Sequence, residues 1–125
     1  MDYILVGMGG ALGAITRYVV SKVTAEKINT PFPLGTWLVN ITGAFFLSFL
    51  LGLLAHGVVL GRDLGPALTT GFLGAYTTFS TFSYEAVRLV EDGESFRALS
   101  YIISSVIFGL AAAWLGILVS IHLVS

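Results

Sequence analysis

The chain has 125 residues, of which 56% are hydrophobic and only 10% are charged, and its formal net charge is −1. Soluble domains carry about 25% charged residues, so this composition excludes a water-soluble fold as well as an intrinsically disordered chain. A nucleic-acid binder is also excluded, because it needs a basic surface. The absence of cysteine excludes disulfides and thiolate metal sites. We therefore expect an integral membrane protein with one domain, residues 1–125.

Four stretches of the sequence are long and apolar enough to cross a bilayer, which takes about 20 residues per helix. The first is 3–21, with Arg17 as its one charge, and the three uncharged stretches are 34–61, 64–84 and 98–125. All other charges lie at Asp2 or in the connections 22–33, 62–63 and 85–97. Proline and glycine in 29–33 and 61–66 mark chain reversals. The pattern predicts an all-α integral membrane protein with four transmembrane helices.

The first span combines closely spaced glycines with an arginine. Gly9 and Gly13 are four residues apart, a spacing that lets another helix approach closely. A dinucleotide-binding loop would need a third glycine where Leu12 stands. An arginine at the centre of a membrane helix costs about 2.5–3.5 kcal/mol on insertion scales. We interpret Arg17 as a cation that lines a water-filled vestibule, with snorkelling to the interface as the alternative.

Polar side chains recur on one face of the second and fourth spans. Thr36 and Asn40 are spaced i, i+4, as are Tyr101 and Ser105. Asn40 is an amide in an apolar span and has two N–H donors to satisfy. It serves either as an interhelical hydrogen-bonding residue or as a donor to a ligand.

The third span is rich in hydroxyl groups and contains Gly71 and Gly74. Threonine and serine compete for backbone hydrogen bonds, so the sequence predicts a break between Gly74 and Ser80, with an unbroken helix as the alternative. Carbonyls freed at a break of this kind can coordinate a small cation. Phe79 and Phe82, spaced i, i+3, share a face if the helix resumes there. The positive edges of their rings can face an anion, and core packing is the alternative.

The four spans contain no Asp or Glu, and Glu85 stands at the edge of one of them. A proton-coupled carrier usually needs a carboxylate within the membrane. No Ser–His–Asp or paired-carboxylate arrangement is available within the spans either, so the chain is not expected to be an enzyme.

Three segments together closely resemble the Fluc (CrcB) family of fluoride channels. They are 9–18 (GGALGAITRY), 35–43 (GTWLVNITG) and, most specifically, 71–85 (GFLGAYTTFSTFSYE). The resemblance implies a passive, fluoride-selective channel in the plasma (inner) membrane that exports cytoplasmic fluoride and relieves its toxicity. It also implies an antiparallel, dual-topology homodimer with two pores and a structural sodium ion at the dimer interface.

The resemblance further implies roles for individual residues. The pore residues would be Asn40, Phe79, Phe82, Thr36, Tyr101 and Ser105. Arg17 would lie in a vestibule, and the backbone carbonyls of Gly74 and Thr77 would hold sodium.

Two features depart from the family pattern. One turn beyond Ser105, where another hydroxyl is expected, the chain has Gly109. Four basic residues lie on one side of the predicted spans and Arg62 alone on the other, a bias that places the termini outside rather than in both orientations. A small proton-coupled multidrug exporter is the alternative function, although it would need a carboxylate in the first span.

Overall fold

The computed structural model describes residues 3–124, so Asp2 lies outside the described range. Three of the described helices are long and apolar enough to cross a membrane. They are α1 (Tyr3–Lys27), α2 (Leu34–Ala55) and α6 (Ser95–Val124). At 1.5 Å per residue, each exceeds the roughly 30 Å thickness of a hydrocarbon core.

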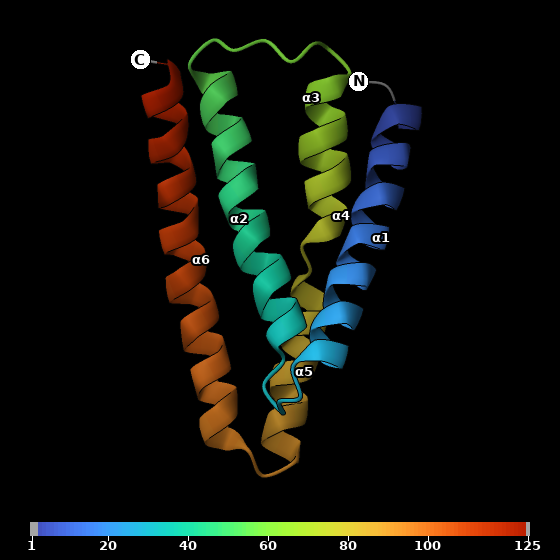
Figure 1. The fold of residues 1–125 in the computed structure, drawn as a ribbon, viewed down its shortest axis with the longest axis vertical. Helices are drawn as coiled ribbons and strands as arrows, with labels where there is room; N and C mark the ends of the chain where they lie inside the picture. The colour runs from blue at the N-terminus through green and yellow to red at the C-terminus, as the bar shows by residue number, and fades with distance from the viewer. Residues whose placement is uncertain (1–2, 125) are drawn as a thin grey trace.

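The fourth predicted span is a broken helix (Figure 1). Its first half consists of α3 (Leu64–Pro66), the π-helical η1 (Ala67–Leu73) and α4 (Gly74–Tyr76). Thr77 and Thr78 are extended, with ψ of 156° and φ of −149°, and α5 (Phe79–Glu91) follows. The predicted break between Gly74 and Ser80 is confirmed.

Both termini lie at the same end of the structure as the connection between α2 and α3, and the other two connections lie at the opposite end (Figure 1). The predicted boundaries of the connections were wrong. Helix α1 continues to Lys27 and α5 to Glu91, because the Lys, Glu and Arg residues beyond the apolar stretches are good helix formers. Helix α2 ends six residues earlier than the charge pattern predicts, and Gly57 then takes a positive φ of 91°.

Close approach through glycine joins α1 to the first half of the broken helix. A Cβ atom on Gly9 would meet the carbonyl oxygen of Ala67, and one on Gly13 would meet that of Phe72. Helices α2 and α6 lie side by side in the same way, with Gly52 against the hydroxyl of Ser120. The prediction that the first-span glycines mediate helix packing is confirmed.

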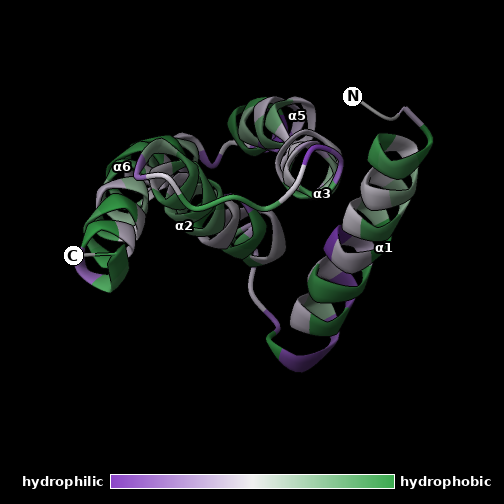
Figure 2. Ribbon diagram, turned by 90° about the horizontal axis from the view of Figure 1, so that it is seen from above, coloured by the Kyte–Doolittle hydropathy of each residue, from purple (hydrophilic) through white to green (hydrophobic). Residues whose placement is uncertain are grey.

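Two small hydrophobic clusters are buried, and many further hydrophobic residues are exposed on the outer surfaces of the helices (Figure 2). Large exposed side chains on α1 and α6 include Leu12, Ile15, Leu110 and Trp114. An exposed apolar surface of this extent is typical of helices in contact with lipid or with another membrane protein. The structure is that of a multi-pass helical membrane protein.

Candidate functional site

The break between α4 and α5 is closed by the side chain of Asn40 on α2. The Asn40 Nδ2 atom donates to the carbonyl oxygen of Thr78 at 2.9 Å, and the Thr78 backbone N–H donates to Asn40 Oδ1 at 2.8 Å. The side-chain amide thus replaces both helical hydrogen bonds that the Thr78 peptide groups lack in extended backbone. This pairing uses one of the two Nδ2 N–H donors.

The carbonyls of Gly74 and Thr77 are among those that lose their usual helical partners at the break. In a continuous helix the Thr78 N–H would donate to the carbonyl of Gly74, but here it donates to Asn40. Similarly, the N–H of Thr81 donates to the side-chain hydroxyl of Thr78 at 3.2 Å, not to the carbonyl of Thr77. The carbonyls of Gly74 and Thr77 are therefore free to accept from another group, or to coordinate a cation.

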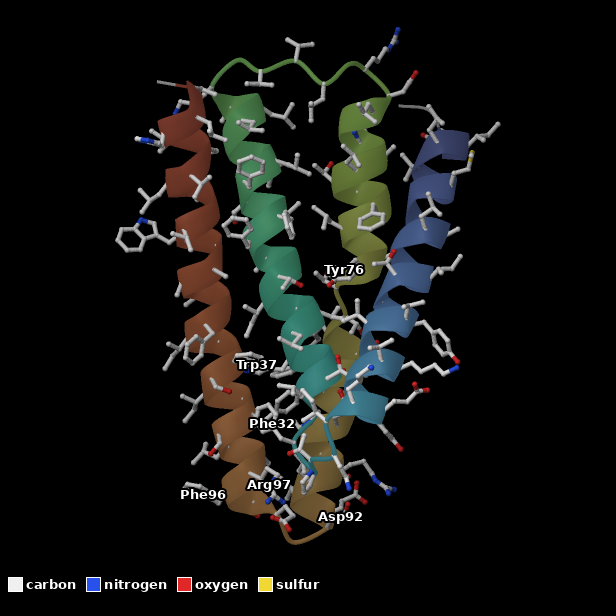
Figure 3. All side chains as sticks on the ribbon, viewed as in Figure 1. Phe32, Trp37, Tyr76, Asp92, Phe96 and Arg97 are labelled. Atoms are coloured by element: carbon white, nitrogen blue, oxygen red, sulfur yellow. The ribbon has the colours of Figure 1, made fainter. Side chains whose placement is uncertain are left out.

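A second polar contact holds the upstream half of the break against α2. The Tyr76 hydroxyl lies 2.9 Å from that of Thr42, which itself donates to the carbonyl of Leu38 at 2.7 Å. One residue further along α2, Gly43 leaves room for the methyl group of Thr77. Figure 3 shows Tyr76 at the end of α4, beside the break.

A chain of aromatic rings leads from the break toward α6. The Phe79 and Phe82 centroids are 5.9 Å apart, and those of Phe82 and Tyr101 are 5.0 Å apart. Phe79 is 79% exposed, whereas Tyr101 is completely buried. The rings thus run from the surface of the subunit into its interior.

The row of aromatic rings ends at Tyr101, whose hydroxyl belongs to a polar cluster. It donates to Glu85 Oε1 at 3.3 Å and also interacts with the side chain of Thr36. Since a phenol has a single O–H donor, this proton is committed to the Glu85 carboxylate. Tyr101 and Thr36 are buried, whereas the Glu85 carboxylate is partly exposed.

One turn along α6, the Ser105 hydroxyl is buried and is the one such side-chain oxygen without a partner among the described residues. Its neighbour Ser104 is instead engaged: it accepts from the indole N–H of Trp37 at 3.1 Å and donates to the Tyr101 carbonyl at 3.3 Å. Figure 3 shows Trp37 between α2 and α6. A Cβ atom at Gly109 would have no neighbour within 4 Å, so the structure leaves open space there.

Two cavities flank the aromatic chain. The first, of about 310 Å³, lies at the break and is lined by residues that include Asn40, Thr77 and Phe79. The second, of about 490 Å³, opens between α1, α2 and α5 and reaches Thr36 and Glu85. We call this second cavity the vestibule. Phe79 lines the first cavity, and Thr36, which interacts with Tyr101, lines the second, so the rings lie between the two.

Comparison with known proteins places this geometry in a family. The model of the family described as "CrcB-like protein, Camphor Resistance (CrcB)" matches residues 4–117. The chain belongs to the CrcB family.

Curated CrcB relatives match nearly the whole chain. "Fluoride-specific ion channel FluC 2" of Clostridium acetobutylicum is 45% identical over 120 residues, which cover 96% of this chain and 98% of the relative. "Fluoride-specific ion channel FluC" of Acidobacterium capsulatum is 44% identical over 130 residues and is covered completely, as is this chain. The relative from Thermotoga maritima, with the same name, is 39% identical over 119 residues, covering 94% of this chain and 93% of the relative. All three names describe channels and not enzymes.

In this CrcB protein, the residues predicted for the site fall into two groups. Asn40, Thr77 and Phe79 meet at the break, with Gly74 one turn before it. Thr36 lines the vestibule and interacts with Tyr101, which packs against Phe82, and Ser105 lies one turn further along α6.

Arg17 belongs to neither group of this CrcB site. It is partly exposed on α1, one turn before Ser21, which lines the vestibule, and it has no ion pair among residues 3–124.

Sequence reasoning missed two residues that the structure brings to the candidate site. Thr78 caps α5 and pairs with Asn40; a threonine immediately before a helix is a common N-cap, and this signal was present. Glu85 was noted only as a residue at the edge of a span, yet it accepts from Tyr101. No sequence pattern links two residues 16 positions apart on different helices.

Proposed function

We propose that this protein is a passive channel that selects fluoride and exports it from the cytoplasm. The observation that carries the proposal is the line of Phe79, Phe82 and Tyr101 between the two cavities, in a chain whose relatives are called fluoride-specific ion channels. Neutral donors and aromatic rings lie along this line, and the Glu85 carboxylate adjoins only its Tyr101 end, so an anion would exchange water for weak, reversible contacts.

Selectivity would come from replacement of the fluoride hydration shell. Fluoride is small and strongly hydrated, so a pore must supply donors at short range. Ser105 has a buried hydroxyl without a partner among the described residues, and Asn40 has one amide N–H beyond its bond to Thr78. Thr36 and Tyr101 would add hydroxyls if the Tyr101 proton turned from Glu85 toward the anion. Larger halides would fit these contacts less well.

Transport would be passive and would serve fluoride resistance. In an acidic setting, hydrogen fluoride crosses a membrane as a neutral acid and dissociates inside. A channel in the plasma (inner) membrane would let the trapped anion leave along the negative membrane potential. A proton-coupled multidrug exporter is not supported, because the one described carboxylate of α1, Glu26, is exposed in the last turn of that helix.

We further propose that two copies form an antiparallel, dual-topology dimer. The high exposure of Phe79, next to a cavity open at the subunit surface, supports a pore completed by a partner. Four basic residues, Lys22, Lys27, Arg88 and Arg97, lie on one side of the membrane spans, and this bias opposes equal insertion in both directions. Labelling of single cysteines at residues 59 and 94 from each side of the membrane would report the orientation. Labelling of each position from one side alone would contradict dual topology.

The released carbonyls of Gly74 and Thr77 fit a structural sodium ion, because carbonyl oxygens in unwound membrane segments are typical ligands for this cation. We infer that the same carbonyls of a second copy complete the coordination of the ion. The ion would hold the two broken helices together and would take no part in selecting fluoride.

The test is fluoride efflux from liposomes that contain the purified protein. We expect fluoride to leave much faster than from empty vesicles and chloride to stay behind. Retention of fluoride, or equally fast loss of chloride, would contradict the proposed function. Replacing sodium by a large organic cation during purification is expected to lower the dimer fraction, which tests the sodium site separately.

A further inference from the structure

The vestibule carries charge on one wall only. Glu85 and Arg88 line it from one face of α5, at positions i and i+3, and Asp92 lines it from the C-cap of that helix, at i+7. The side chains that line it from α1, α2 and the connection between them are uncharged, among them Ser21, Thr24, Thr30 and Phe32. The charge that an ion meets in this cavity is therefore set by α5.

Arg88 and Arg97 lie in neighbouring parts of the chain but differ in ion pairing. Arg97 Nη1 lies 2.8 Å from Glu94 Oε2 and does not line the vestibule. Arg88 is exposed, lines the vestibule and forms no ion pair within residues 3–124. Its positive charge is thus available to a mobile anion, whereas that of Arg97 is largely neutralised.

Asp92 brings a charge of opposite sign to the same cavity. It is exposed at the C-terminal end of α5, where the helix dipole already disfavours a negative charge. Its carboxylate lines the same cavity as Arg88, without an ion pair in the described part of the chain. Its negative charge therefore faces the same cavity as the positive charge of Arg88.

We propose that Arg88 and Asp92 set the rate at which fluoride reaches the pore, Arg88 by attracting the anion into the vestibule and Asp92 by repelling it. The proposal rests on the proposed function. A unit charge about 8 Å from the path of an ion in water changes the ion's local concentration roughly two- to threefold. This electrostatic effect acts over several ångströms of solvent, so high ionic strength should screen it.

The experiment compares fluoride efflux from liposomes containing Arg88→Gln, Asp92→Asn or unsubstituted protein, at about 0.01 M and about 1 M ionic strength, where the Debye length falls from about 30 Å to about 3 Å. At low salt we expect Arg88→Gln to slow efflux and Asp92→Asn to accelerate it, each roughly two- to threefold. At high salt all three proteins should agree. Arg97→Gln is the matched control: Arg97 does not line the vestibule, so the variant should change the rate less than Arg88→Gln at low salt and not at all at high salt.

Arg88→Lys distinguishes charge from folding, since it keeps the charge and should keep the rate. Effects of the same sign for Arg88→Gln and Asp92→Asn, effects that persist at high salt, or a change with Arg97→Gln of equal size would overturn the proposal. If the unsubstituted protein itself retains fluoride, the proposed function fails. If the unsubstituted protein conducts fluoride and both variants conduct it at the same rate, the role of the α5 charges is contradicted but the proposed function is not.

Discussion

Asn40 and the backbone of Thr78 form a reciprocal pair, with hydrogen bonds of 2.9 and 2.8 Å in opposite directions between a side-chain amide and the backbone of a broken helix. Unpaired backbone groups are costly inside a membrane, where no water replaces the missing partner. A break in a spanning helix therefore needs a side chain with both a donor and an acceptor. Asparagine supplies both on a short side chain.

Asn40→Leu is expected to destabilise the fold and to stop fluoride efflux. The substitution removes both partners of Thr78, and each buried group left unsatisfied costs about 1–3 kcal/mol. Thermal unfolding in detergent and the liposome assay would measure the two effects. Thr16→Val is the control, because the Thr16 hydroxyl bonds only to Leu12 in its own helix. Unchanged stability of Asn40→Leu would show that the pair is not needed to hold the break.

The Tyr76 and Thr42 hydroxyls should be energetically coupled, since they lie 2.9 Å apart beside the break. Tyr76→Phe and Thr42→Val are each expected to lower the free energy of unfolding by about 1 kcal/mol. Thr42→Val also loses the bond to Leu38, so only a double-mutant cycle isolates the pair. We expect a coupling of about 0.5–1.5 kcal/mol in the cycle. Additive effects would mean that the contact contributes nothing to stability.

The sequence predicted the break but not how it is built. Glycine, serine and threonine are weak helix formers, so the position of the break between Gly74 and Ser80 was predictable. The π-helical turns of η1, which α1 approaches closely at Gly13, were not predicted. Asn40 was recognised as polar in an apolar span, yet its partner Thr78 is 38 residues away. Such pairings follow from tertiary packing and leave no local pattern.

The boundaries of the helices show a second limit. Charge marks where the apolar part of a helix ends, and this correctly separated the spans. It does not mark where the helix itself ends, so α1 extends through Lys22 and Glu26. The vestibule lies beside this extension and beside the end of α5, and it could not be anticipated from the spans alone.

Gly13→Ala is expected to loosen the contact between α1 and η1. The added methyl group would collide with the carbonyl oxygen of Phe72, a backbone atom that cannot rotate away. Overpacking of this kind typically costs about 1–3 kcal/mol. Gly109→Ala is the matched control in α6, since nothing lies within 4 Å of its added carbon, and it should unfold at the same temperature or higher. Equal loss of stability in both variants would contradict the packing role of Gly13.

Phe82→Ile is expected to abolish or greatly slow fluoride efflux while the dimer still assembles. The substitution keeps an apolar side chain but removes the ring between Phe79 and Tyr101, at 5.9 and 5.0 Å from their centroids. Size-exclusion chromatography and the liposome assay separate assembly from transport. Phe96→Ile serves as the control, because Phe96 projects outward from α6 and is 84% exposed (Figure 3). Normal efflux through Phe82→Ile would remove this ring from the pore.

Ser105→Ala should separate stability from transport. The Ser105 hydroxyl is buried without a partner in the described structure, so its removal relieves the cost of an unsatisfied group and should leave the unfolding temperature unchanged or higher. If fluoride accepts from this hydroxyl, the variant loses a hydrogen bond to a charged group, which is worth about 1.5–3 kcal/mol. Since 1.36 kcal/mol corresponds to a tenfold change in rate, efflux should fall by about tenfold or more when this contact limits permeation.

Ser120→Ala provides the comparison on the same helix. Its hydroxyl is also buried, but it donates to the Ile117 carbonyl at 2.6 Å and packs against Gly52, far along α6 from the aromatic chain. We expect a small loss of stability and unchanged efflux, the reverse of Ser105→Ala. A structural role for Ser105 would instead make the two variants alike, with lower stability and normal transport in both. Opposite responses would therefore show that the Ser105 hydroxyl contributes to ion transport and not to the stability of the fold.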